Sequence, residues 1–199
     1  MIADCTAIIL AGGDSQRMGR DKANLLLGDQ TLLQRVIATM QQVFPHVIVS
    51  VRYPRPEINI LQVCDEYTNG GPLAGLSTAL NQITTPWAFA VACDMPFVLP
   101  AMIERLAQRR GQCKAVVPVV NGQPQPLAAF YARDCSVAIR EILAGDGKHS
   151  LSALLERLDV CYVDETDLSD ADPHLRSFFD LDTPQDVAQA LKIGTLKTG

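Results

Sequence analysis

A glycine-rich, positively charged loop follows the first apolar run of the 199-residue sequence. Residues 10–22 read LAGGDSQRMGRDK, with Gly12 and Gly13 adjacent and with Arg17 and Lys22 among the cations. Adjacent glycines can adopt positive φ and turn backbone N–H groups toward phosphate oxygens, and the cations add charge-assisted hydrogen bonds. The glycine spacing matches neither a Walker A loop nor a G-x-G-x-x-G turn. The loop predicts a triphosphate site, with a strand-to-helix turn carrying solvated charges as the alternative.

Two aspartates each come directly after an apolar run. Asp65 follows residues 58–64 and precedes a second glycine-rich turn, NGGPLAG at 69–75, which contains Gly71. Its carboxylate could accept from a ribose hydroxyl or a base amine, although an Asx-turn is the commoner role of a loop aspartate. Asp94 follows residues 87–93 and precedes Pro96. A single carboxylate of this kind suits Mg²⁺, which keeps waters and bridges substrate phosphates, and a turn or cap is the alternative.

Short apolar runs alternate with amphipathic segments along the whole chain. This alternation predicts a three-layer α/β fold around a mainly parallel sheet. Ligands of such sheets bind outside the carboxyl ends of the strands, where the glycine-rich loop, Asp65 and Asp94 all fall. The expected strands are 6–10, 46–51, 58–64, 87–93, 115–120, 127–131 and 160–163, and the expected helices are 32–44, 73–83, 100–110, 136–143, 150–158 and 184–191.

Composition and charge exclude several classes of protein. With 48% apolar and 20% charged residues the chain has the usage of a folded protein rather than a disordered one. A formal charge of −5 leaves no global basic field for a nucleic-acid backbone, so we expect no nucleic-acid partner. Residues 156–186 hold ten acidic and two basic side chains, which makes the rest of the chain positive and better suited to an anionic substrate.

The length and the termini predict the organisation and the compartment. A chain of 199 residues favours one domain, with residues 1–110 as a nucleotide-binding part and residues 111–199 as an acceptor-binding part. The six cysteines have no C-x-x-C spacing, so we expect reduced thiols rather than a zinc site. No signal-peptide pattern begins the sequence, and no run approaches 18 apolar residues. These features predict a cytoplasmic protein that does not enter a membrane.

Four motifs in order resemble those of the molybdenum cofactor guanylyltransferases, a family of nucleotidyltransferases. They are the loop at 10–22, Asp65 with GPLAG at 71–75, CDMP at 93–96 and QPL at 125–127. A GKHSL segment at 147–151 and a closing FDLDTPQD at 179–186 also fall at family positions. The closing segment departs from the family pattern, because Asp180 and Asp182 replace the usual asparagines. The resemblance implies a Rossmann-like nucleotidyltransferase domain.

The resemblance also implies site residues. Arg17, Lys22 and Asp94 would be the catalytic residues, with Asp94 as the ligand of Mg²⁺. A polar residue near positions 50–52 would contact the nucleotide, but the motif does not determine its register. The residues expected to bind the nucleotide are Leu10, Ala11, Gly12, Gly13, Lys22, Asp65, Gly71 and Asp94.

The implied reaction joins GMP from GTP to molybdenum-molybdopterin and releases pyrophosphate. No general base is required, because the attacking group is an anionic phosphate. Lys148, and more weakly Arg133, could meet the phosphate of the pterin. For Asp182 we favour a cap for the helix at Pro184, with a second metal ligand and a pterin contact as the alternatives. Other proteins of molybdenum cofactor synthesis and the enzymes that accept the product are expected partners.

Three alternatives compete with this reaction. They are a cytidylyltransferase acting on the same pterin, a sugar-phosphate nucleotidyltransferase, and a regulatory protein that binds nucleotide without turnover. Cytidylyltransferases of the superfamily usually read LAAG where this chain reads LAGG, and they lack the GPLAG turn at 71–75, so both features favour guanine. The combination of Lys22 with Asp94 argues against a protein that only binds.

Overall fold

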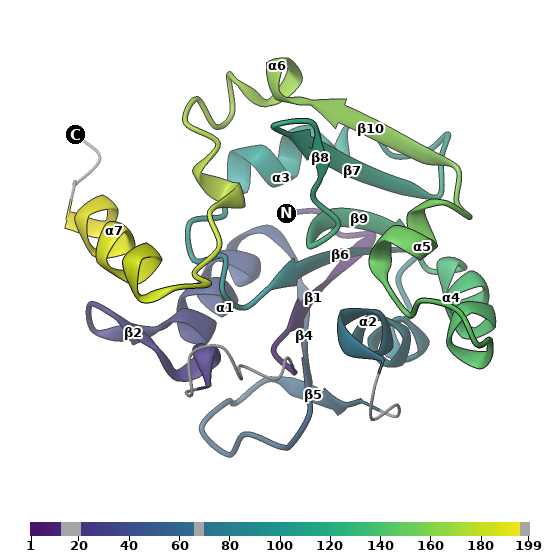
Figure 1. The fold of residues 1–199 in the computed structure, drawn as a ribbon, viewed down its shortest axis with the longest axis horizontal. Coiled ribbons are helices and arrows are strands. Elements are labelled where there is room, and N and C mark those ends of the chain that lie inside the picture. The colour runs from purple at the N-terminus through teal and green to yellow at the C-terminus, as the bar shows by residue number, and fades with distance from the viewer. Residues whose placement is uncertain (13–20, 66–69, 196–199) are drawn as a thin grey trace.

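A central β-sheet forms the middle layer of the protein (Figure 1). The computed structural model describes residues 1–12, 21–65 and 70–195. Strands follow one another across the sheet in the order β10-β7-β9-β6-β1-β4-β5, and the short β8 pairs with β7. Their bounds are β1 (Cys5–Leu10), β4 (His46–Val51), β5 (Leu61–Cys64), β6 (Trp87–Ala92), β7 (Ala115–Val120), β8 (Gln123–Pro124), β9 (Ala128–Ala132) and β10 (Val160–Asp164).

Most neighbouring strands of this sheet are parallel. Strand β1 pairs in parallel with both β4 and β6, β4 pairs in parallel with β5, and β7 pairs in parallel with β10. Strand β9 runs antiparallel between β6 and β7. The expectation of a mainly parallel sheet is therefore confirmed, with β9 reversed inside it and the short β8 reversed beside β7.

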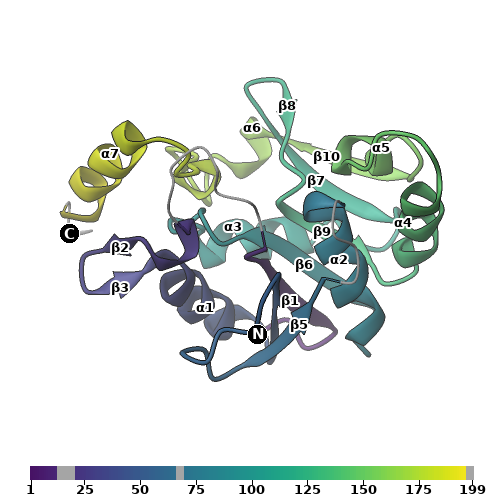
Figure 2. The ribbon, with the colours of Figure 1, turned by 60° about the horizontal axis from the view of Figure 1, so that its bottom comes forward.

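Helices cover both faces of the sheet, which makes the three layers that the sequence predicts. Alternate residues of β1 divide between the faces, with Ile9 in the core under α1 and α3 and Ile8 in the core under α2, α4 and α5. Figures 1 and 2 show these two groups of helices on opposite sides of the strands. The bounds are α1 (Leu32–Val43), α2 (Gly71–Gln82), α3 (Pro100–Ala107), α4 (Cys135–Ala144), α5 (Leu151–Leu155), α6 (Glu165–Leu168) and α7 (Pro184–Thr195).

The helix ends follow local sequence chemistry. Thr31 caps α1 in a reciprocal capping box with Gln34, and the chain leaves the helix at Phe44, just before Pro45. Helix α3 has proline at its first position, as expected, but it ends at Ala107 rather than at residue 110. Helix α5 likewise ends at Leu155, three residues before the predicted end.

The third strand of the chain begins later than its apolar pattern predicts. Strand β5 starts at Leu61 rather than at residue 58, because residues before it form a loop. The side chain of Gln62 closes this loop: it accepts from the backbone N–H of Arg55 and donates to the carbonyls of Arg55 and Ile58. A side chain that supplies these backbone hydrogen bonds removes the need for strand pairing there.

A third, smaller apolar cluster joins the C-terminal helix to a hairpin that the sequence did not predict. Strands β2 (Leu26–Leu27) and β3 (Gln30–Thr31) turn at Gly28, whose φ of +72° favours glycine. Leu27 of β2 packs with Leu181 and Ala190 of the C-terminal segment. Figure 2 shows α7 beside β2. Among the described helices, none has the length and apolar character needed to cross a bilayer.

Candidate active site

A cavity of about 380 Å³ opens at the carboxyl ends of β1, β4, β5 and β6. Because these strands are parallel, the residues that follow them meet at one edge of the sheet. The walls come from both halves of the sequence. They are Leu10, Ala11, Gly12, Asp21, Lys22, Ala23, Ser50, Asp65, Gly71, Pro72, Gly75, Ala92, Cys93, Asp94, Met95, Gln125, Pro126, Leu127, Phe178, Asp180 and Asp182.

Backbone hydrogen bonds extend beyond the strand ends and hold the first residues of the cavity wall. The N–H of Ala11 donates to the carbonyl of Ser50 at 2.8 Å, and the N–H of Cys93 donates to the carbonyl of Leu10 at 3.1 Å. The N–H of Asp65 donates to the carbonyl of Val51 at 3.1 Å. These hydrogen bonds therefore fix the backbone at the point where each loop leaves the sheet.

Ser50 and Asp65 pack tightly between two glycines at one end of the cavity. The hydroxyl of Ser50 donates to Asp65 Oδ1 at 2.7 Å, and Ser50 is only 1% exposed. A Cβ on Gly12 would lie 2.8 Å from Asp65 Oδ2, and a Cβ on Gly75 would lie 2.6 Å from Ser50 Oγ. Both distances are shorter than side-chain carbons tolerate, so glycine is required at both positions for the carboxylate to stay where it is.

The position of Asp65 determines its titration. Burial raises the pKa of Asp65 above its ordinary value, while the hydrogen bond from Ser50 and the positive charge of Arg52 lower it in part. One carboxylate oxygen is bonded to Ser50, and the other lies beside Gly12 at the cavity wall. Asp65 can therefore accept hydrogen bonds from an amine or a hydroxyl at this wall.

Three charged side chains converge at the other end of the cavity. Lys22 Nζ lies 2.9 Å from Asp94 Oδ2 and also forms an ion pair with Asp182 Oδ1. The side chains of Lys22 and Asp94 are 15% and 18% exposed, against 49% for Asp182. Burial lowers the pKa of Lys22, but its hydrogen bonds to Asp182 and Asp94 outweigh this effect and raise the pKa. Lys22 is therefore a cation at neutral pH.

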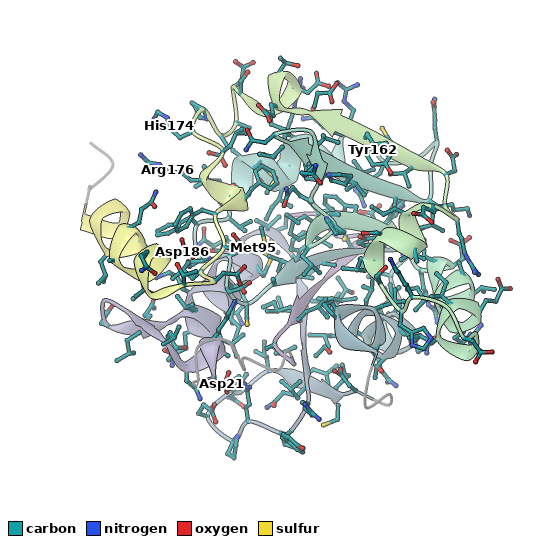
Figure 3. All side chains as sticks on the ribbon, in the orientation of Figure 1. Asp21, Met95, Tyr162, His174, Arg176 and Asp186 are labelled. Carbon is teal, nitrogen blue, oxygen red and sulfur yellow. The ribbon has the colours of Figure 1, made fainter. Side chains whose placement is uncertain are left out.

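Separate parts of the fold position these three groups. Lys22 begins the 3₁₀ helix η1 (Lys22–Asn24), which Asp21 caps by accepting from the N–H of Ala23 at 3.1 Å. The carbonyl of Asp94 accepts from the N–H of Leu181 at 3.1 Å, which brings the C-terminal segment to this end of the cavity. Figure 3 labels residues near these groups in the chain, Asp21, Met95 and Asp186, and shows that they come from separate segments.

The hydrogen bonds at the start of α7 show that Asp182 does not cap this helix. Thr183 and Asp186 form a reciprocal cap, because the N–H of Asp186 donates to Thr183 Oγ1 and the N–H of Thr183 donates to Asp186 Oδ2. The side chain of Asp182 turns to Lys22 instead. Asp182 is therefore not the helix cap, and the metal-ligand and pterin-contact roles stay open.

Asp94 and Asp182 supply two of the oxygen ligands that a hard cation needs. Asp94 and Asp182 both bond the ammonium of Lys22, so their oxygens point toward a common region. Nowhere in the described residues do three or more His, Cys, Asp or Glu side chains group as a metal site. This donor set suits Mg²⁺, which commonly takes one or two protein carboxylates and completes its shell with phosphates and water.

Asp180 adds a third carboxylate to the same wall of the cavity. Desolvation of this carboxylate raises its pKa, and the nearby negative charges of Asp182 and Asp94 raise it further. The acidic groups on this wall therefore repel one another, and a bound cation would relieve that repulsion.

The structure brings most of the predicted site residues together. Gly13 and Arg17 lie outside the described residues. Lys148, in the connection between α4 and α5, is exposed and does not line the cavity. The predicted residues that line the cavity are Leu10, Ala11, Gly12, Lys22, Asp65, Gly71, Asp94 and Asp182.

Arg133 also lies away from the cavity, at the opposite edge of the sheet. It follows β9, and β9 runs antiparallel to β6, so the residue after β9 lies beside the amino end of β6. There the N–H of Arg133 donates to the carbonyl of Pro86 at 2.9 Å. Its side chain lines a separate cleft with Trp87 and Lys114. The prediction that Arg133 meets the acceptor in this site does not hold.

Two wall residues outside the quoted motifs, Ser50 and Phe178, have side chains suited to ligand contact, and the sequence analysis did not assign them. Phe178 belongs to the 3₁₀ helix η2 (Arg176–Phe178), in a stretch where no element was expected. Ser50 was within the expected range of a polar contact, but its register was not determined. Its signal was available, since it is a single hydroxyl residue in the otherwise apolar second half of the strand HVIVSV.

Comparison with known proteins gives consistent matches. The model of the MobA-like NTP transferase domain matches residues 7–161. A probable molybdenum cofactor guanylyltransferase of Pelotomaculum thermopropionicum is 34% identical over 187 residues, which are 93% of this chain and 91% of that protein. The molybdenum cofactor guanylyltransferase of Syntrophotalea carbinolica is 33% identical over 185 residues, covering 91% of this chain and 88% of that protein.

A solved structure matches equally broadly. Molybdopterin-guanine dinucleotide biosynthesis protein A of Archaeoglobus fulgidus superposes with a TM-score of 0.84 and 26% identity, covering 94% of this chain and 97% of that one. The family model spans most of this chain, and relatives more than 30% identical cover over nine-tenths of it. The chain therefore belongs to the MobA-like NTP transferase family, and it is a nucleotidyltransferase.

Proposed function

We propose that this enzyme transfers GMP from GTP to molybdenum-molybdopterin, giving the molybdopterin guanine dinucleotide cofactor and pyrophosphate. The observation that carries the proposal is the two-ended cavity, with Asp65 between glycines at one end and Lys22 between carboxylates at the other. A nucleotide needs these two environments, one for its base and sugar and one for its phosphates. Relatives that match nearly the whole chain are named as molybdenum cofactor guanylyltransferases, which supports this choice of substrates.

The transfer requires alignment and charge neutralisation rather than a base. A phosphate oxygen of the acceptor attacks the α-phosphorus of GTP in line, and the bond from that phosphorus to the bridging oxygen breaks, so pyrophosphate leaves with the electron pair. In this proposal Lys22 meets the charge that develops on the leaving group, and Arg17 assists it. Asp94, with Asp182, would hold Mg²⁺, and the cation would supply positive charge against the phosphates.

Base selection belongs to the Asp65 end of the cavity. Guanine has two adjacent donors, the N1–H and the exocyclic amine, and Asp65 presents an oxygen beside Gly12 that could accept from them. Cytosine and adenine lack this pair of donors. A site built on such hydrogen bonds rejects a base that leaves its polar groups unpaired.

The acceptor would occupy the part of the cavity lined by the second half of the chain. Gln125, Pro126 and Phe178 line this part, and Asp180 and Asp182 continue the wall toward Lys22. Phe178 offers a ring face to a pterin, and the amide of Gln125 can both donate to and accept from a heterocycle. Lys148 stays a weaker candidate for the acceptor phosphate, because it lies outside the cavity wall.

The test is a three-nucleotide comparison on the purified chain. We expect pyrophosphate release from GTP, with Mg²⁺ and the molybdopterin acceptor present, to exceed release from CTP or ATP clearly, and the dinucleotide product to appear by mass spectrometry. Competition calorimetry of the three nucleotides gives the base preference independently of turnover. Equal or tighter binding of CTP would assign the chain to the cytidylyltransferases. Tight GTP binding without any pyrophosphate would indicate a regulatory nucleotide binder.

A further inference from the structure

Arg55 makes a two-sided contact with the short helix that presents Lys22. It belongs to the loop between β4 and β5, outside the wall of the cavity. Its Nη2 donates to Asp21 Oδ2 at 2.6 Å, and its Nη1 donates to Asn24 Oδ1 at 3.2 Å. Asp21 is the cap of η1 and Asn24 is its last residue, so one guanidinium holds both ends of the turn.

Both partners of this contact are themselves held. The second oxygen of Asp21 accepts from the N–H of Ala23, and the amide of Asn24 donates back to Asp21 at 3.3 Å. On the other side, the backbone of Arg55 is bonded through its N–H and its carbonyl to the side chain of Gln62 in β5. A continuous set of hydrogen bonds therefore connects the sheet to η1. The side chain of Arg55 is only 14% exposed, whereas that of Asp21 is 45% exposed, so the arginine is held in place while its ion pair with Asp21 stays in contact with water.

We propose that Arg55 is a positioning residue of the nucleotidyl-transfer site, which acts by holding η1 so that the ammonium of Lys22 stays between Asp94 and Asp182. This proposal rests on the proposed function, because the step that Arg55 would affect is the proposed transfer of GMP. A single 3₁₀ turn of three residues is not stable by itself. Lysine is also a long and flexible side chain, so its placement depends on where its backbone is held. Arg55 holds the backbone of η1 from outside the turn, through its hydrogen bonds to Asp21 and Asn24.

The proposal predicts a loss in turnover that depends on Lys22. We expect Arg55→Ala to lower kcat by about 10-fold or more, since small displacements of a phosphate-binding group are costly, with a smaller change in KM for GTP. In a Lys22→Ala background the same change should cost less than about 2-fold, because there is no ammonium left to position. Arg55→Lys should restore little, because an ammonium cannot hold Asp21 and Asn24 together.

A matched control separates this role from general stability. Arg110 is also 14% exposed, and it pairs with Asp4 at 3.1 Å. It lies over the rings of Trp87 and Phe130, away from the cavity wall. Arg110→Ala removes an equally buried ion pair, so it should lower the melting temperature comparably while leaving kcat near that of the wild-type enzyme.

The outcomes of this cycle are distinct. A kcat loss for Arg55→Ala that disappears in the Lys22→Ala background supports the proposal. Unchanged kcat, or equal losses in both backgrounds, overturns it. If Arg55→Ala does not fold, as judged by circular dichroism, Asp21→Asn enters the same cycle, because it keeps an oxygen for Ala23 but removes the charge that Arg55 binds. Failure of the proposed function is a different result, namely no pyrophosphate from GTP with the wild-type enzyme.

Discussion

The two ends of the cavity are built by different means. At one end Ser50 and Asp65, 15 residues apart, pack between glycines with no space for another side-chain carbon. At the other end Lys22 and Asp182, 160 residues apart, are joined by charge, and Asp182 is half exposed. The Asp65 end keeps its geometry because its neighbours Gly12 and Gly75 have no side chain. The Lys22 end keeps its geometry because opposite charges attract. Substitutions that add volume or remove charge should therefore affect the two ends differently.

Loss of the cation should have the largest effect. We expect Lys22→Ala to reduce kcat by about 100-fold or more, because a positioned cation in a closed site acts on charge that appears in the transition state. The fold should survive, since the short turn that carries Lys22 is held by Asp21 and Arg55 rather than by the ammonium of Lys22. Steady-state pyrophosphate release is the measurement. Arg133→Ala is the matched control, because it removes a cation outside the cavity, and near-normal turnover of Lys22→Ala would remove Lys22 from the catalytic residues.

Removal of a carboxylate at the same end comes next. Asp94→Asn should abolish most of the Mg²⁺-dependent turnover, roughly 10- to 100-fold, because a neutral amide is a poorer ligand for a hard cation. Asp182→Asn should cost less, since its side chain is 49% exposed against 18% for Asp94. A Mg²⁺ titration of kcat for both variants distinguishes them. If Asp94→Asn leaves the titration unchanged while Asp182→Asn weakens it, the metal ligand is Asp182.

Added volume should affect the opposite end in affinity rather than in rate. Gly12→Ala places a carbon 2.8 Å from Asp65 Oδ2, so we expect the Kd for GTP to rise by about 10-fold while kcat changes little. The preference over CTP should narrow, because the displaced carboxylate is the group that would accept from guanine. Calorimetry checks both. Gly147→Ala is the control, because a Cβ there meets no atom within 4 Å, and an equal loss for both variants would exclude steric displacement of Asp65.

The smallest effect concerns stability and pH. The pKa of Asp65 is raised above its ordinary 3.8 in the folded protein. At pH values between the unfolded pKa and the higher folded pKa, the folded state therefore binds more protons than the unfolded state. The carboxylate thus lowers stability as the pH rises through that window, and the penalty persists at neutral pH. Asp65→Asn should raise the free energy of unfolding at pH 7 and leave it unchanged at about pH 3.

Denaturant unfolding of Asp65→Asn at the two pH values measures this difference. The same variant should bind GTP more weakly, so a gain in stability would accompany a loss in affinity. A variant that is less stable than the wild-type chain at pH 7 would show that the bond from Ser50 outweighs the burial of the charge.

Much of the fold was predictable because its signals are local. The strands at residues 46–51 and 115–120 have the predicted bounds, since β-branched runs bounded by turns need no distant information. The start of β5 was not predictable from apolar content, because the side chain of Gln62 closes the preceding loop. The hairpin at 26–31 was also missed, because its two-residue strands are too short to show alternation.

The site divides in the same way. Gly12, Lys22, Asp65 and Asp94 could be found from the sequence because each follows a strand or lies in a motif, and the parallel sheet brings strand ends together. Arg133 was misplaced because the direction of β9 decides where it lies. A clue was present: the connection from Val120 to Ala128 is too short for the crossover that a parallel strand needs.

The sequence by itself determined the residue types at the strand ends, the order of the longer strands and helices, and the glycines expected to admit a phosphate. Only the tertiary structure decided that Ser50 is the partner of Asp65 and that Asp182 bonds Lys22 rather than capping α7. It also decided that Arg55 holds η1, the turn that carries Lys22. The reason is physical. Propensity and periodicity act over a few residues, whereas an ion pair between distant positions exists only after the sheet has set the distance between its loops.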